Sequence, residues 1–210
     1  MLGAAYGHGM AFGRFLAGLS GPLVRLVFRP DVSGREHIPA GGCVISANHL
    51  SGFDAWALSY TFRGRFVRYM GKNDLFRRPL LGPVVRSLGV FPARAEGSLA
   101  GGVTRAAELV AVGETVAIFP EGARRRGMTR RPRRGAARTA LLAGVPLVPV
   151  AICGTDGWRD QARWSIAVGA PVRLDDLSDI DLETATGEAT RRLWDAITTL
   201  EDGLTGAGVR

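Results

Sequence analysis

The sequence predicts an α/β fold: a mixed, mostly parallel sheet covered by helices and preceded by an N-terminal helical hairpin. Short apolar, β-branched runs such as Cys43–Ala47 are typical of buried strands. Longer stretches with apolar residues at helical spacing, such as Ser98–Val112, alternate with these runs. A glycine or proline follows most of these runs and stretches, as Gly113 and Pro120 do. Strands that alternate with helices form sheets covered on both faces.

The first 30 residues differ from the rest and predict membrane-associating helices. Residues 10–28 are nearly long enough to span a bilayer, but Arg14, Arg25 and Gly21-Pro22 interrupt them. We therefore expect two short helices over residues 1–30, without a signal peptide, and a separate domain over residues 31–210. A hairpin packed on the domain and a peripheral membrane contact are both compatible with this pattern.

Over residues 31–91 the pattern predicts strands and helices in alternation. The expected strands are Asp31–His37, the short apolar run Cys43–Ala47, Phe66–Met70 and a strand that begins at Val90-Phe91. The expected helices are the apolar stretches Asp54–Phe62 and Pro79–Leu88.

The same alternation continues to the C-terminus. The expected helices are Ser98–Val112, the small-residue stretch Gly135–Ala143, and Leu182–Leu204, which has one apolar face. The expected strands are Thr115–Phe119, Pro146–Cys153, and Trp164–Val168 with Pro171–Leu174 as a last strand or hairpin. The prolines of Pro146–Cys153 indicate an unusual register or an edge strand.

Composition excludes several classes of protein. With 210 residues, 46% of them hydrophobic, and a mean hydropathy of +0.09, the chain is long and apolar enough for one folded domain. Its two cysteines, Cys43 and Cys153, exclude a disulfide scaffold and a four-ligand zinc site. Both lie in apolar runs, as reduced core cysteines do.

The net charge of +8 is distributed unevenly along the chain. Residues 175–202 hold nine acidic and two basic side chains, a net charge of −7, so the remainder carries +15. Eight arginines fall within residues 124–138, with no acidic residue among them. Arginine suits phosphate because of its bidentate fork. We expect an anionic partner: a phosphate-bearing ligand, an acidic lipid surface or nucleic acid.

Two polar segments directly follow predicted strands, where ligand sites of α/β sheets lie. The first runs from Asn48-His49 to Asp54. On one ideal helix His49 and Asp54 would lie about 140° apart, but a turn between them lets the side chains meet. The carboxylate would then hold one imidazole nitrogen and leave the other as a general base. A structural pair that caps a helix would have the same spacing.

The second polar segment is Phe119–Gly122, which follows the strand that begins at Thr115. Proline before Glu121 indicates a sharp turn, and Gly122 lets a ligand approach the backbone closely. Neither segment contains a plausible covalent nucleophile, so we expect a substrate hydroxyl to attack directly after His49 deprotonates it.

Four blocks of sequence, in order, resemble the glycerolipid acyltransferase family. Asn48-His49 with Asp54 matches the family's N-H-x-x-x-x-D pattern, and Phe119–Gly122 matches F-P-E-G. Residues 72–94, from Lys72 to Arg94, are similar to the block between them, and Val145–Val150 is similar to the V-P-x-V-P-V block. The resemblance covers residues 32–172, and the most similar branch is that of the 1-acyl-sn-glycerol-3-phosphate acyltransferases.

The resemblance implies a role for each matching residue. It makes His49 the general base and Asp54 its orienting carboxylate. The implied substrate-binding residues are Asn48, which supports the turn, and Lys72, Arg94, Glu121, Gly122 and Arg124, with Arg94 toward the phosphate. We expect Glu121 to hold a hydroxyl, an arginine or backbone amides, because a carboxylate repels phosphate. Ala123 and Arg125 depart from the Thr and Ser that the family often has, which leaves the acceptor open.

The expected reaction moves a fatty acyl group from acyl-CoA or acyl carrier protein to the hydroxyl of a lysophospholipid, 1-acylglycerol 3-phosphate first. Other lysolipids, glycerol 3-phosphate and glycolipids are alternative acceptors. No cofactor or metal is expected, because a thiolate leaves readily. Backbone amides near Gly52 or Gly122 would stabilise the oxyanion. The candidates for an apolar groove that holds the acyl chain are Phe53, Trp56, Leu58, Tyr60 and Phe62, and the core is the alternative place for each.

Two functions of other classes remain open. A non-catalytic module that binds anionic lipid would explain the arginines and the N-terminal helices without the His49–Asp54 pair. A nucleic-acid-binding domain would explain the arginines, but the sequence lacks its motifs and stacking aromatics, so we do not expect nucleic acid as a partner. We expect a peripheral or monotopic protein on the cytoplasmic face of the cell membrane, in contact with its anionic surface.

Overall fold

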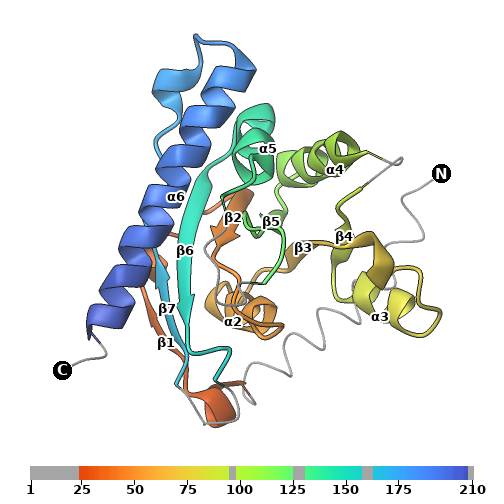
Figure 1. Ribbon diagram of the computed structural model, residues 1–210, viewed down its shortest axis with the longest axis vertical. Coiled ribbons are helices and arrows are strands. Elements are labelled where there is room, and N and C mark those ends of the chain that lie inside the picture. The colour runs from red at the N-terminus through yellow and green to blue at the C-terminus, as the bar shows by residue number, and fades with distance from the viewer. Residues whose placement is uncertain (1–23, 95–97, 125–130, 158–162, 208–210) are drawn as a thin grey trace.

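The computed structural model describes residues 24–94, 98–124, 131–157 and 163–207 (Figure 1). Within these residues seven strands form one sheet in the order β1-β7-β6-β2-β5-β3-β4. The strands are β1 Asp31–Ser33, β2 Cys43–Ala47, β3 Val67–Gly71, β4 Val90–Pro92, β5 Thr115–Ala117, β6 Leu147–Cys153 and β7 Ser165–Val168. All neighbouring strands are parallel except β6 and β7, which are antiparallel. The sheet is therefore mixed and mostly parallel, which confirms the predicted fold class.

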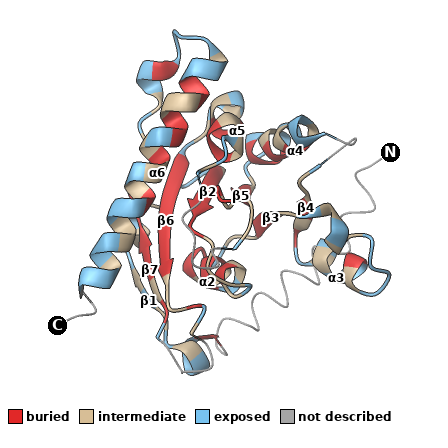
Figure 2. Ribbon diagram, viewed as in Figure 1, coloured by how far each residue is buried: buried red, intermediate tan, exposed pale blue. Residues whose placement is uncertain are grey.

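Helices cover both faces of the sheet, as Figure 2 shows by the buried residues between the layers. They are α2 Asp54–Thr61, α3 Leu81–Ser87, α4 Leu99–Ala111, α5 Gly135–Ala143 and α6 Leu182–Ala207. In the central strand β2, Cys43 and Ile45 pack with α2, while Val44 packs with α4, α5 and α6. Successive side chains of a strand point to opposite faces, so a fully buried strand needs apolar residues throughout.

The structure corrects the first predicted strand, Asp31–His37. Only Asp31–Ser33 is a strand, and Arg35–His37 is a 3₁₀-helix. The reason is Gly34, whose φ of +73° turns the chain away from the sheet. Its absent side chain also matters, because a Cβ there would lie 1.9 Å from the carbonyl oxygen of Val168.

Strand β6 is not an edge strand, which corrects one interpretation of its prolines. It pairs with β2 on one side and β7 on the other. The carbonyl of Pro149 accepts a hydrogen bond of 2.9 Å from the N–H of Gly169, just beyond the end of β7. Pro149 has no N–H with which to donate the reciprocal hydrogen bond to Gly169. This missing bond lies at the end of the β6–β7 pairing, so an interior strand tolerates the proline. Residues 171–174, the other part of the expected hairpin, form no strand.

The predicted helical hairpin over residues 1–30 lies outside the described residues except for its last part. Residues 24–28 are helical. Val24 is buried, and the Phe28 ring stacks on Trp164 with 4.0 Å between the ring centroids. Among the helices described, none is long and apolar enough to cross a membrane.

Candidate active site

The two polar segments meet at the carboxyl end of the sheet, because β2 and β5 are parallel neighbours. The His49 and Phe119 rings stack with 4.1 Å between their centroids. The backbone N–H of His49 donates to Glu121 Oε1 over 3.3 Å. Residues 72 positions apart in the chain therefore share one site.

His49 and Asp54 form the expected pair. His49 Nδ1 lies 2.7 Å from Asp54 Oδ2. Residues 51–53 form a turn, and α2 begins only at Asp54, so the two side chains do not share one helix. The backbone N–H groups of Leu50 and Ser51 also donate to Asp54 Oδ2, over 2.7 and 2.9 Å. The turn thus closes around the carboxylate and brings His49 to it.

Asp54 is completely buried, whereas 19% of the His49 side chain is exposed. A buried carboxylate is stable only where hydrogen bonds compensate its charge. An ionised carboxylate only accepts, so Nδ1 carries the proton of the neutral His49 ring. Nε2 is then the nitrogen that is able to take a proton.

Thr155 is a site residue that we did not predict. Its hydroxyl donates to Asp54 Oδ1 over 2.5 Å, and both residues are fully buried. Thr155 follows β6, the other parallel neighbour of β2, and comes after Gly154, whose φ is +83°. Thr155 comes just after a buried strand, as the segments of His49 and Phe119 do. The same sequence signal could therefore have singled out Thr155.

Asn48 lies beside the site but does not line it. Its side-chain amide is buried and bridges to β6: it donates to the Ile152 carbonyl over 2.8 Å and accepts from the Ile152 N–H over 2.8 Å. It also donates to Glu201 Oε1 of α6 over 2.9 Å. Asn48 therefore positions the segment that carries His49, and the structure does not place it at the substrate.

Glu121 and Gly122 shape the turn beside His49. Of the partners expected for Glu121, the structure shows a backbone amide, that of His49. Gly122 has a φ of +67°, and a Cβ there would lie 2.5 Å from Arg133 Nε. The Gly122 N–H already donates to the Phe119 carbonyl over 3.1 Å. The Gly122 N–H is therefore engaged, and an oxyanion donor near Gly52 or Gly122 stays a prediction.

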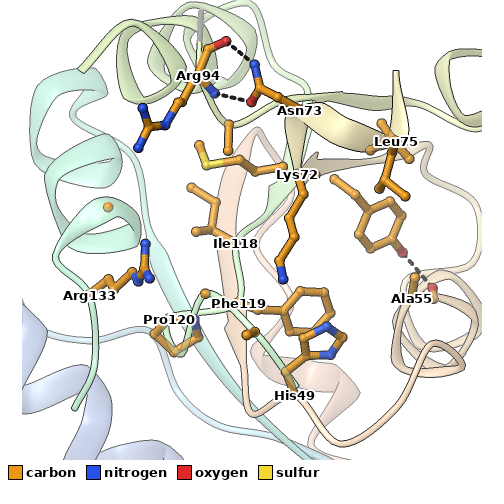
Figure 3. Close-up of a pocket in the computed structure, with 18 of the residues that line it drawn as sticks. His49, Ala55, Lys72, Asn73, Leu75, Arg94, Ile118, Phe119, Pro120 and Arg133 are labelled. Carbon is orange, nitrogen blue, oxygen red and sulfur yellow. Dashed lines mark hydrogen bonds between the residues drawn. The ribbon is translucent and has the colours of Figure 1, made fainter. Parts of the chain in front are cut away.

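His49 lies in an open cleft of about 2290 Å³ (Figure 3). A site for one small molecule measures about 300–1,000 Å³, so this cleft has room for more than one. Basic side chains dominate its polar lining: Arg65, Lys72, Arg77, Arg94, Arg124, Arg133, Arg134 and Arg138, against the single acid Asp74 among the described lining residues.

The basic residues approach the cleft from several elements. Figure 3 shows Lys72, after β3, extending toward Phe119 and His49, with Arg94 at the top of the view beside Asn73 and Arg133 at the left. The Asn73 side chain fixes the Arg94 backbone: it accepts from the Arg94 N–H over 2.9 Å and donates to the Arg94 carbonyl over 2.8 Å. Arg124 lies near Gly52, with its guanidinium 3.8 Å from where a Cβ on Gly52 would be. These cations could bind one or more phosphate groups.

Among the described residues, no three His, Cys, Asp or Glu side chains are grouped to hold a metal ion.

Most candidates for the acyl groove belong to the core, the alternative that the sequence left open. Of the five candidates only Trp56 lines the cleft. Leu58 and Phe62 are fully buried in the core, and Phe53 and Tyr60 pack against it. The apolar lining comes instead from β3, α4 and the segments around α3, and it includes Met70, Leu75, Leu88, Val90, Leu99 and Val103.

A family model described as Acyltransferase matches residues 29–153, more than half of the chain. The chain therefore belongs to the acyltransferase family. It is 33% identical over 131 residues to a 1-acyl-sn-glycerol-3-phosphate acyltransferase of Borreliella burgdorferi, covering 60% of this chain and 52% of that protein. It is 32% identical over 133 residues to the chloroplastic enzyme BAT2 of Brassica napus, which bears the same description, covering 61% and 38%. The chain thus matches about half or less of these relatives.

The fold has a counterpart among solved structures. The 1-acyl-sn-glycerophosphate (LPA) acyltransferase PlsC from Thermotoga maritima superposes with a TM-score of 0.65. The match covers 98% of this chain and 89% of that one at 20% sequence identity. At this identity the similarity concerns the fold alone.

Proposed function

We propose that this protein transfers a fatty acyl group from acyl-CoA or acyl carrier protein to the free hydroxyl of a lysophospholipid. The first-choice acceptor is 1-acylglycerol 3-phosphate, which gives phosphatidic acid. The observation that carries the proposal is the His49–Asp54 pair at 2.7 Å in a basic cleft with apolar walls. Family membership and the printed names of the relatives support the same reaction.

In the proposed mechanism His49 Nε2 removes the proton of the acceptor hydroxyl as its oxygen attacks the thioester carbonyl. Asp54 stabilises the imidazolium that forms, through the 2.7 Å hydrogen bond at Nδ1. When the tetrahedral intermediate collapses, the C–S bond breaks and the thiolate takes the proton from His49. A backbone amide near Gly52 or Gly122 is a candidate donor to the oxyanion.

The lining of the cleft suits both substrates. Lys72, Arg94 and Arg124 would bind phosphate, since arginine and lysine donate to phosphate oxygens. Met70, Leu75 and Leu99 would contact acyl chains. Because the donors are cytoplasmic and the acceptor is a lipid, we propose that the protein works peripherally on the cytoplasmic face of the membrane.

The product distinguishes the candidate functions. Purified protein is incubated with palmitoyl-CoA and, separately, lysophosphatidic acid, glycerol 3-phosphate and other lysophospholipids, and the lipids are identified by mass spectrometry. Phosphatidic acid from lysophosphatidic acid is the expected product. A product from another acceptor alone would keep the acyltransferase and change its acceptor. Absence of any acyl product, together with binding to anionic vesicles, would favour the lipid-binding module.

A further inference from the structure

The surface of α3 exposes apolar side chains. Leu80, at the N-terminal end of the helix, is 88% exposed, and Val84 and Leu88 are 49% and 38% exposed. Residues four apart lie on the same side of a helix, so the three form one stripe. Contiguous exposed apolar surface in a folded protein marks an interaction site more often than scattered single residues do.

Two arginines precede this stripe in the chain. Arg77 and Arg78 are exposed, and neither has an ion-pair partner among the described residues. Residues 72–94 contain five basic side chains and one acidic one, Asp74. Apolar residues between basic ones are typical of surfaces that lie in the interface of an anionic bilayer. We define the α3 face as Leu80, Val84 and Leu88 with Arg77 and Arg78.

The α3 face adjoins the cleft. Leu88 and Arg77 belong to both, because they also line the cleft. Helix α3 lies beside β4, the strand at one end of the sheet (Figure 1). A bilayer that touched this face would therefore meet the mouth of the cleft, where a lipid acceptor has to enter.

The charge of the whole molecule agrees with this orientation. Residues 175–202, with a net charge of −7, include most of α6. Helix α6 packs on β6 and β7, toward the other end of the sheet from β4 and α3 (Figure 1). An anionic membrane would repel this acidic end and attract the α3 face.

We propose that the α3 face docks on an anionic lipid bilayer, with Leu80 and Val84 entering the interface and the arginines binding headgroups. The proposal rests on the proposed function only in stating how the lipid acceptor reaches the cleft. A second copy of the chain, or its residues 1–23, would be a different occupant of the same surface.

An environment-sensitive probe tests docking directly. Leu80→Cys, Val84→Cys and, as the control, Ile180→Cys are labelled with NBD in a Cys153→Ala background. Ile180 is 43% exposed and lies between acidic residues just before α6. Cys43 should not react, because it is fully buried and burial raises the pKa of its thiol.

With vesicles of phosphatidylcholine and phosphatidylglycerol at 7:3, the NBD emission at positions 80 and 84 should shift to the blue and rise severalfold, and that at position 180 should not change. No shift at 80 and 84 would overturn the proposal, whether the protein binds the vesicles by another surface or not at all. A shift that grows with protein concentration in the absence of vesicles would also overturn it, because it would indicate self-association.

A second experiment separates docking from catalysis. The double variant Leu80→Asp/Val84→Asp should lose about tenfold in activity on lysophosphatidic acid embedded in vesicles. It should keep wild-type activity on monomeric hexanoyl-lysophosphatidic acid, since neither residue lines the cleft. Equal activity of variant and wild type on embedded acceptor would overturn the proposal. If wild type acts on neither form of lysophosphatidic acid, the first-choice acceptor of the proposed function fails, and the probe experiment still decides docking.

Discussion

Asp54 is held more firmly than its partner His49. It accepts hydrogen bonds from the His49 ring, from two backbone N–H groups and from Thr155, and it is completely buried. Its position is therefore set by the surrounding structure. His49, which is partly exposed and stacks on Phe119, depends on Asp54 for its orientation.

Thr155→Val should reduce activity by loosening Asp54. The variant keeps the shape of the side chain and removes the donor at Oδ1, a hydrogen bond to a charged group that contributes about 1.5–3 kcal/mol. We expect kcat to fall about tenfold with little change in KM, because the cleft lining is unaltered. Steady-state kinetics with palmitoyl-CoA and lysophosphatidic acid measure this.

Thr155→Ser is the matched control, because it keeps the hydroxyl and should keep most of kcat. The ¹H NMR resonance of the His49 Nδ1–H gives a readout that does not depend on overall stability. It should be preserved in Thr155→Ser and shift or broaden in Thr155→Val. An unchanged resonance and an unchanged kcat in Thr155→Val would show that Thr155 does not position Asp54.

At the scale of single residues, the sequence predicted the contact between site residues that are close together in the chain. His49 and Asp54 are separated by five positions, and a turn between a buried strand and a helix was enough to pair them. Thr155 lies 101 positions from Asp54, and only the pairing of β6 with β2 brings it there. The sequence showed that Thr155 follows a buried strand, but the local pattern did not show that this strand pairs with β2.

The segment that carries Arg94 depends on close packing against α4. Gly102 of α4 is buried, and a Cβ there would lie 2.0 Å from the Ala93 carbonyl oxygen. Gly102→Ala should therefore displace residues 93–94 and cost about 1–3 kcal/mol of stability. If Arg94 binds the acceptor phosphate, KM for the acceptor should rise as well.

Gly203→Ala in α6 is the control for Gly102→Ala, since its Cβ would meet nothing within 4 Å. It should stabilise the helix by about 0.5–1 kcal/mol and leave KM unchanged. Urea unfolding and acceptor titrations measure both effects. Wild-type stability in Gly102→Ala would contradict the close contact.

Helix α6 is tied to the segment before it by Arg192. Its guanidinium donates to Asp176 over 2.7 and 2.8 Å and to Glu188 over 2.8 Å. The hydrogen bond from Arg192 lowers the pKa of Asp176 to about 2. Hydrogen bonds from Arg191 and then Arg192 lower the pKa of Glu188 to about 2.

These depressed pKa values predict how stability depends on pH. A carboxyl whose pKa is lower in the folded state contributes stability above its unfolded pKa, near 4, and loses it as the pH falls toward 2. Asp176→Asn/Glu188→Gln should therefore be less stable than wild type at pH 7. The difference should shrink between pH 4.5 and 2, as urea midpoints would show. A difference that is constant with pH would contradict it.

The elements themselves were largely predictable, because apolar periodicity and terminal glycines mark them. The exceptions have local causes that the pattern does not contain. Gly34 ended β1 early by a close approach to Val168, which belongs to a strand far along the chain. Pro149 indicated an edge strand. The N–H that proline lacks would point to where β7 ends, so the interior strand β6 tolerates it.

At the scale of the whole molecule, the predicted sheet brought the right segments together, whereas most candidates for the acyl groove belong to the core. Leu58 of α2 fills the core beneath the sheet, and Trp56 is the one groove candidate that lines the cleft. Which side of a helix faces a cavity depends on what covers the other side. The side of α2 that faces the cleft is set by the packing of β3, α3 and α4. The sequence of α2 itself does not contain this packing.

The central claim is that His49 is the base of an acyl transfer in this cleft. The most direct test compares thiol release from palmitoyl-CoA, with lysophosphatidic acid present, for wild type, His49→Ala and His37→Ala. His37 is the matched control, because its ring bonds the Val168 carbonyl and does not line the cleft. With folding verified by circular dichroism, His37→Ala should keep most of the wild-type rate, and His49→Ala should lose about 100- to 10,000-fold. A His49→Ala rate equal to that of wild type and His37→Ala would contradict the claim.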